Sequence, residues 1–214
     1  PAPDGYTYEA LASDLGRVID LEVPEGPLVL GGHSMGCHTV LSWALANPDR
    51  VSALILAGPV FTGDEDAADL SRWDERADAL ERGGPAEFAR VSLENIQGDE
   101  KTIAAVERIA RARTELHQHP GAVADALRQL PRSRPFESIA QLAALKMPAL
   151  VIASHDEIDP GHPYAVAEAY AETLPAGELV SEAKGESPLS WQGGRLSRVI
   201  VQFLGRNGIE GEAG

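Results

Sequence analysis

Short, continuously apolar runs alternate with longer amphipathic segments along most of this chain. Runs at 27–32, 51–57, 148–154 and 178–183 predict strands. Apolar residues at helical spacing predict helices over 8–21, 35–47, 164–174 and around 196–204. Strands that are apolar on both faces are typical of a parallel sheet covered by helices on both sides. The pattern therefore predicts an α/β fold with a mostly parallel sheet.

The pattern changes between residues 62 and 145, where no strand-like run occurs. Three amphipathic helices are predicted there, punctuated by Gly83-Gly84-Pro85 and by the prolines between 131 and 135. We interpret 62–145 as a helical cap inserted between two strands, since insertions at the carboxyl ends of parallel strands commonly form lids. The expected core then has two parts, 1–61 and 146–206, followed by a loose tail at 207–214.

Composition narrows the class of partner. The chain has 214 residues, of which 33 are acidic and 18 basic, giving a net charge of −15. Nucleic acid and anionic membrane surfaces would repel such a protein, so we expect a small-molecule substrate. No run reaches transmembrane length and the start lacks a signal-peptide layout, which makes a cytoplasmic location the expectation. The single cysteine, Cys37, excludes an internal disulfide and is expected to fill the core.

The most informative motif joins the first predicted strand to the following helix. Gly32-His33-Ser34-Met35-Gly36 has the Gly-x-Ser-x-Gly pattern of a nucleophile elbow, a strained turn that exposes the serine. We expect both glycines to be needed because strand and helix approach closely there. The Met35 backbone N–H would lie at the start of the helix, where it could stabilise an oxyanion.

Two groups of residues could suggest a metal site. His117 and His119 are two residues apart, and on a helix they would face different ways. A second, loose set lies between the third strand and the next helix and comprises His155, Asp156, Asp159 and His162. Neither group has the spacing typical of a metal centre, so we expect neither metal nor other cofactor.

The predicted elements follow in the order elbow, helix, strand, helical insertion, strand with acidic loop, strand with polar loop and closing helix. This order resembles that of the α/β-hydrolase fold family, and of its esterase-like serine hydrolases in particular. The resemblance covers nearly the whole chain. It implies that Ser34 is the nucleophile and that Asp156, which follows the strand after the insertion, is the acid that orients the base. Asp159 is the alternative acid, although an aspartate before Pro160 also suits a turn.

The resemblance fails at the position where the family carries its histidine. Family members usually carry Gly-His-x-Pro after the last strand, where this chain has Gly185-Glu186-Ser187-Pro188. A glutamate is a poor base at neutral pH unless its pKa is raised, as a neighbouring Asp156 could do. His162 is the alternative base, while His33 and His38 are interpreted as structural.

The start of the chain also departs from the family. Relatives usually have several strands before this point, including a loop that supplies the second oxyanion N–H. Without them the strand at 27–32 would be an edge, so we expect a fragment, self-association or a complementing chain that completes the sheet. Two functions follow as hypotheses: a serine hydrolase acting on an ester or related carbonyl, or a non-catalytic relative with a binding or scaffold role.

Overall fold

The computed structural model describes residues 5–63, 67–94, 100–155 and 161–209. They form two compact units, one comprising Pro1–Thr7 with Asp64–Arg134 and the other comprising Tyr8–Gly63 with Pro135–Gly214. The second unit contains the sheet, and the first contains the helices expected in the insertion. Residues 135–145, which we had expected in the insertion, belong to the unit with the sheet.

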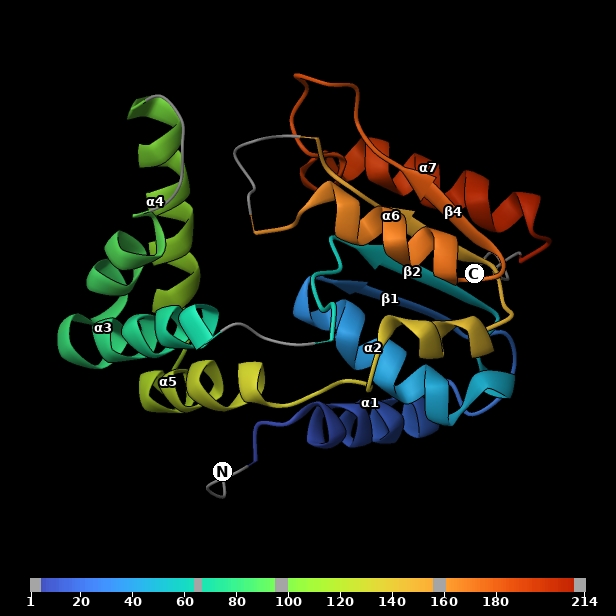
Figure 1. The fold of residues 1–214 in the computed structure, drawn as a ribbon, viewed down its shortest axis with the longest axis horizontal. Coiled ribbons are helices and arrows are strands. Elements are labelled where there is room, and N and C mark those ends of the chain that lie inside the picture. Colours follow the sequence, from blue (N-terminus) through green and yellow to red (C-terminus); the bar gives the residue numbers. More distant parts are fainter. Residues whose placement is uncertain (1–4, 64–66, 95–99, 156–160, 210–214) are drawn as a thin grey trace. The chain divides into compact units, whose positions relative to one another are not determined.

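The sheet has four parallel strands in sequential order: β1 (Val29–His33), β2 (Ala53–Ala57), β3 (Ala149–Ile152) and β4 (Gly177–Val180). Leu30 pairs with Leu54, and Leu150 with Ile55, so the strands stay in register although the insertion separates β2 from β3. The predicted parallel sheet is confirmed. Because the strands are parallel, the loops that follow all four emerge at one rim of the sheet (Figure 1).

Helices cover both faces of the sheet, as predicted. On one face lie α1 (Tyr8–Glu22), α2 (Met35–Ala46), α6 (Tyr164–Thr173) and the short helix η3 (Ile139–Ala144), while α7 (Gly193–Arg206) lies on the other (Figure 1). Leu54 and Leu56 of β2 pack on the first face, and Ile55 between them packs towards α7. All five residues of β2 are buried, which explains its continuous apolar sequence.

The unit formed by the insertion is helical. It contains α3 (Ala67–Ser92), α4 (Glu100–Glu115), α5 (Pro120–Gln129) and η2 (Leu130–Arg132). α3 is two helical arms joined at Gly84, whose φ of 66° turns the chain before Pro85 begins the second arm. Its small core is centred on Ala77, Leu80 and Ala124.

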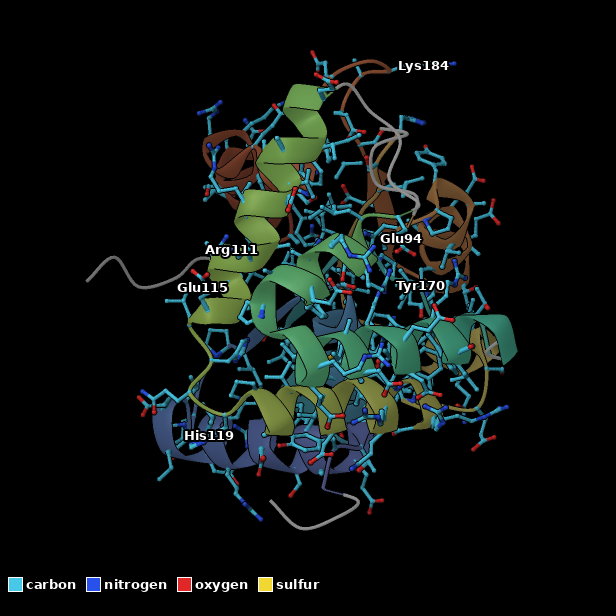
Figure 2. All side chains as sticks on the ribbon, turned by 90° about the vertical axis from the view of Figure 1, so that its left-hand side faces the viewer. Glu94, Arg111, Glu115, His119, Tyr170 and Lys184 are labelled. Carbon is cyan, nitrogen blue, oxygen red and sulfur yellow. The ribbon has the colours of Figure 1, made fainter. Side chains whose placement is uncertain are left out.

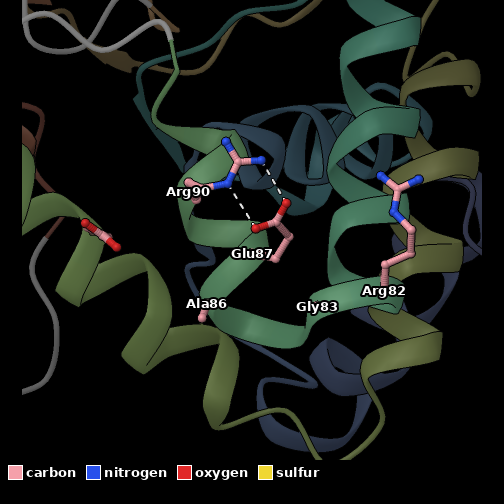
Figure 3. A pocket seen from close by; sticks show the side chains of 6 residues that line it. Arg82, Gly83, Ala86, Glu87 and Arg90 are labelled. Carbon is pink, nitrogen blue, oxygen red and sulfur yellow. Dashed lines mark hydrogen bonds and ion pairs between the residues drawn. The ribbon is translucent and has the colours of Figure 1, made fainter.

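Charged pairs surround that small core. Arg128 of α5 binds Asp78 and Glu81 of α3, each at 2.7 Å, and Arg111 binds Glu115 one turn along α4 (Figure 2). An open pocket of about 480 Å³ is lined by Arg82, Gly83, Ala86, Glu87, Arg90 and Glu107. At this pocket Arg90 donates two hydrogen bonds to the Glu87 carboxylate (Figure 3).

Two single-turn helices, η1 (Pro48–Arg50) and η4 (Leu189–Trp191), complete the described elements. In the described part of the chain, no helix combines the length and the apolarity that spanning a bilayer requires.

Candidate active site

Ser34 occupies the strained turn that the sequence predicted. It follows β1 directly and precedes α2, and its φ of 53° and ψ of −119° make it the one non-glycine residue with positive φ among the described residues. Such a backbone is unfavourable for a residue with a Cβ and persists only where its surroundings impose it. The Ser34 N–H donates to the Ala57 carbonyl of β2 at 2.9 Å, which fixes the turn to the neighbouring strand.

The two glycines of the elbow differ in importance. A Cβ at Gly32 would lie 2.3 Å from the carbonyl atoms of Gly36 and 2.5 Å from the Cys37 nitrogen. A Cβ at Gly36 would meet no atom within 4 Å beyond its own helical turn. The expectation that both glycines are required was therefore wrong for Gly36, because close approach of strand and helix occurs only at Gly32.

Buried groups behind the elbow hold α2 in place. Cys37 is fully buried, its thiol donates to the carbonyls of Gly32 and Ala57, and burial raises its pKa to about 12. This thiol is a core group, since a nucleophilic cysteine needs a low pKa.

His38 is buried in the same helix and binds the segment after β2. Its Nε2 accepts the backbone N–H groups of Val60 and Phe61 at 3.2 and 3.1 Å, while Nδ1 lies 3.1 Å from the Tyr8 hydroxyl. Burial, together with the nearby His162, lowers the pKa of His38 to about 4. His38 is thus a neutral structural histidine, as its place in the helix suggested.

Met35 is the first residue of α2. The N–H groups of a first helical turn have no partner within their own helix and point along its axis. The Met35 N–H is one of these groups and directly follows Ser34 in the chain.

His162 lies at the same rim of the sheet as Ser34. Its ring centroid is 5.2 Å from that of His33, the residue before Ser34. The ring also lies against Gly58, where a Cβ would come within 2.9 Å of the His162 Cδ2. Gly58 has a φ of 59° and directly follows β2. The sequence analysis missed this glycine, although a glycine after a buried strand signals such a close approach.

Asp156 and Asp159 lie outside the described residues. Just before them, the ring of His155 stacks on Tyr164, the first residue of α6, with centroids 4.0 Å apart. His155, which follows β3, therefore lies at the rim that carries Ser34.

Glu186 does not have the surroundings of a general base. Its carboxylate is half exposed and forms an ion pair with Arg195 at 2.5 Å. The Arg195 guanidinium lowers the pKa of Glu186, and an N–H bond from Ala183 adds to the effect. The raised pKa considered for this residue is therefore not found.

Glu182 is a buried carboxylate that the sequence analysis did not single out. Only 2% of its surface is exposed, and it accepts hydrogen bonds from Ser154 Oγ, the His155 N–H and the Leu189 N–H. It was missed because 178–183 was expected to be strand, whereas β4 ends at Val180. The one available signal was an acidic residue two positions after the apolar pair Leu179-Val180.

The structure describes His117 and His119 in the turn between α4 and α5, both exposed, and not on a helix as assumed. Among the described residues, no group of three potential ligands is close enough to hold a metal ion. The other ligand set includes Asp156 and Asp159, which lie outside that part of the chain.

Comparison with known proteins agrees with the fold. The sequence profile of a family described as "serine aminopeptidase, S33" matches residues 7–160. The lipase LipV of Mycobacterium tuberculosis is 37% identical over 75 residues, which is 35% of this chain and 26% of that lipase. The chain thus matches about a quarter of the length of this relative.

Solved structures share the fold over nearly the whole chain. A thermophilic esterase from Thermogutta terrifontis superposes with a TM-score of 0.73 at 24% identity, covering 94% of this chain and 73% of the esterase. MenH from S. aureus gives a TM-score of 0.71 at 23% identity, covering 94% and 76% of the two chains. At this identity the likeness establishes the fold.

Proposed function

Because the chain belongs to the serine aminopeptidase S33 family of α/β-hydrolase-fold hydrolases, we propose that it is a serine hydrolase that cleaves an ester or related carbonyl substrate through an acyl-enzyme. The observation that carries this proposal is the backbone of Ser34, held at a φ of 53° between β1 and α2. A serine without a catalytic role would be under no pressure to occupy such a turn, since glycine adopts it without strain.

The proposed reaction has two halves. Ser34 Oγ attacks the substrate carbonyl and transfers its proton to the base, and the Met35 N–H stabilises the oxyanion. The C–O bond to the leaving group then breaks, the protonated base gives its proton to the departing oxygen, and the acyl group stays on Ser34. Water, activated by the same base, releases the acid and regenerates the serine hydroxyl.

We propose His162 as the base. Its ring lies beside His33 and Gly58 at the rim that carries Ser34, and histidine is the side chain that most often serves as a general base in enzymes. Glu186 is the weaker candidate, because its ion pair with Arg195 lowers its pKa and stabilises the proton-free form. The resemblance to the family supports Asp156 as the residue that orients the base.

The decisive test uses a fluorophosphonate probe, which reacts covalently with activated serines. We expect the intact protein to be labelled at Ser34, as located by peptide mass spectrometry. A Ser34→Ala variant with an unchanged circular dichroism spectrum should remain unlabelled. A folded wild-type protein that the probe does not label would overturn the proposal.

A second candidate function is a binding or scaffold role in a relative that has lost its base. Glu186 in the place of the family histidine, already paired with Arg195, favours it. The two functions are separated by the turnover of p-nitrophenyl esters, since substantial wild-type turnover excludes the second. In an inactive chain, activity gained by Glu186→His would support it.

We also propose that the outer edge of β1 takes a further strand, from a second copy or from a complementing chain. Within the described residues β1 pairs with β2 alone, and Gly31 and His33 are exposed. Val18 and Leu21 of α1 are 55% and 79% exposed, which is apolar surface that association could cover. Light scattering should show species larger than a monomer; a compact, inert monomer would contradict this.

A further inference from the structure

Glu182 joins two loops at the rim of the sheet. From the end of β3, Ser154 Oγ donates to one carboxylate oxygen at 3.0 Å, and the His155 N–H donates to the same oxygen. From beyond the 183–188 loop, the Leu189 N–H donates to the other oxygen at 2.9 Å. The side chain is buried, so these bonds form away from bulk water.

The bonding pattern requires an ionised carboxylate. Two backbone N–H groups and one hydroxyl point at the two oxygens, and a carboxylate accepts from all of them without offering a competing proton. Burial raises the pKa of Glu182, but the hydrogen bonds outweigh burial and the net shift is downward. A carboxamide could satisfy one side only, since its NH₂ group would face a backbone N–H.

The two loops held by Glu182 are those that carry the candidate acid and the family's histidine position. His155 directly precedes Asp156, and its ring is also fixed on Tyr164. Leu189 directly follows Gly185-Glu186-Ser187-Pro188 and begins η4. Given the proposed function, we propose that Glu182 is a positioning residue that fixes Ser154 and His155, at the end of β3, relative to Leu189 beyond the β4 loop, as catalysis at this rim requires.

The test compares Glu182→Gln with Glu178→Gln in the intact chain. Glu178 lies four residues earlier on β4 and pairs with Arg206 at the surface, so the same substitution there controls for loss of a carboxylate. For Glu182→Gln we expect kcat for a p-nitrophenyl ester to fall about 10- to 100-fold while KM changes less than about threefold. The control should keep both constants.

A second variant guards against misfolding. Ser154→Ala removes one donor and leaves both backbone N–H groups paired with the carboxylate. We expect it to fold and to lower kcat by roughly two- to fivefold, again with little change in KM. If Glu182→Gln lowered the melting temperature while its folded fraction kept the wild-type kcat and KM, Glu182 would be structural only. That result would overturn the proposal.

Hydrogen exchange separates this inference from the proposed function. The amides of His155 and Leu189 should exchange faster in Glu182→Gln than in the wild type, whether or not the protein is active. An unlabelled wild type with the expected exchange would reject the hydrolase assignment and, with it, the catalytic part of this role. Labelling of Ser34 at wild-type rates in folded Glu182→Gln would reject the positioning role and leave the hydrolase assignment intact.

Discussion

The elbow after β1 and the loop after β4 lie at the same rim of the sheet but follow the family to different degrees. At the elbow, the close approach at Gly32 and the positive φ of Ser34 follow the family's Gly-x-Ser-x-Gly turn. After β4, the family histidine is replaced by Glu186, which is exposed and paired with Arg195. A nucleophile elbow depends on packing along several residues, whereas a base depends on one side chain. One substitution can therefore remove the base and leave the fold unchanged.

The two regions also differ in the charge state of the titratable group that each one buries. Behind the elbow, His38 is kept neutral by burial and by the N–H groups of Val60 and Phe61. At the end of β4, Glu182 is kept ionised by three donors. The segment behind the elbow therefore holds a neutral imidazole, and the end of β4 holds an ionised carboxylate.

The largest effect should come from the choice of base. We expect His162→Ala to lower kcat for a p-nitrophenyl ester by about 100- to 10,000-fold, because general-base catalysis typically contributes that much. Glu186→Gln should change kcat less than about threefold, since its carboxylate is already paired with Arg195. The opposite outcome, with Glu186→Gln inactive and His162→Ala active, would place the base on the β4 loop.

The next effect tests the packing of the elbow. Gly32→Ala should destabilise the protein by about 2–4 kcal/mol, because the new Cβ would lie 2.3 Å from backbone atoms of Gly36. Gly36→Ala should be neutral or stabilise by up to about 1 kcal/mol, since alanine is the better helix former and has room. Urea unfolding measures both, and equal destabilisation by the two variants would refute the asymmetry.

A third effect concerns pH and His38. The unfolded chain takes up this proton below pH 6.5, whereas the folded protein takes it up only near pH 4. Stability should therefore fall as the pH drops through this window, by about 3 kcal/mol in all. His38→Gln should lose this part of the pH dependence in urea unfolding. Tyr8 lies at hydrogen-bond distance from His38, and His162 contributes to its lowered pKa, so His162→Ala serves as the second control.

The smallest effect is expected at the ion pair of the β4 loop. Both side chains of the Glu186–Arg195 pair are more than 40% exposed, and solvent screens such pairs. Arg195→Ala should leave the melting temperature at pH 7 unchanged within error, as measured by calorimetry. A clear drop would show that this loop is more tightly coupled to the fold than its exposure suggests.

The sheet and its covering helices could be predicted because the signals were local and redundant. Continuous apolar runs marked β1, β2 and β3, and the glycine–serine motif marked the turn after β1. β4 was expected to extend to Ala183, but it ends at Val180 and the chain then turns to bury Glu182. The sequence did not predict this burial, because a buried carboxylate is recognised only from the hydrogen-bond donors around it.

The rest of the site depends on contacts between residues far apart in sequence. The approach of His162 to Gly58 and His33 joins the segment before α6 to the ends of β2 and β1, and no local pattern encodes it. The requirement for Gly32 but not Gly36 likewise follows from where α2 packs, which a symmetric motif cannot indicate. The residue types of the site were readable in the sequence, whereas their partners required the structure.

The pairing of β2 with β3 has an evolutionary consequence. Leu54 pairs with Ala149, and Ala57 with Ile152, across the whole inserted helical unit. Closing a chain over such a distance costs only about 0.6 kcal/mol for each doubling of its length. The intervening stretch can therefore be lengthened, trimmed or exchanged at little thermodynamic expense, so it is free to diverge quickly while the chemistry at the sheet is retained.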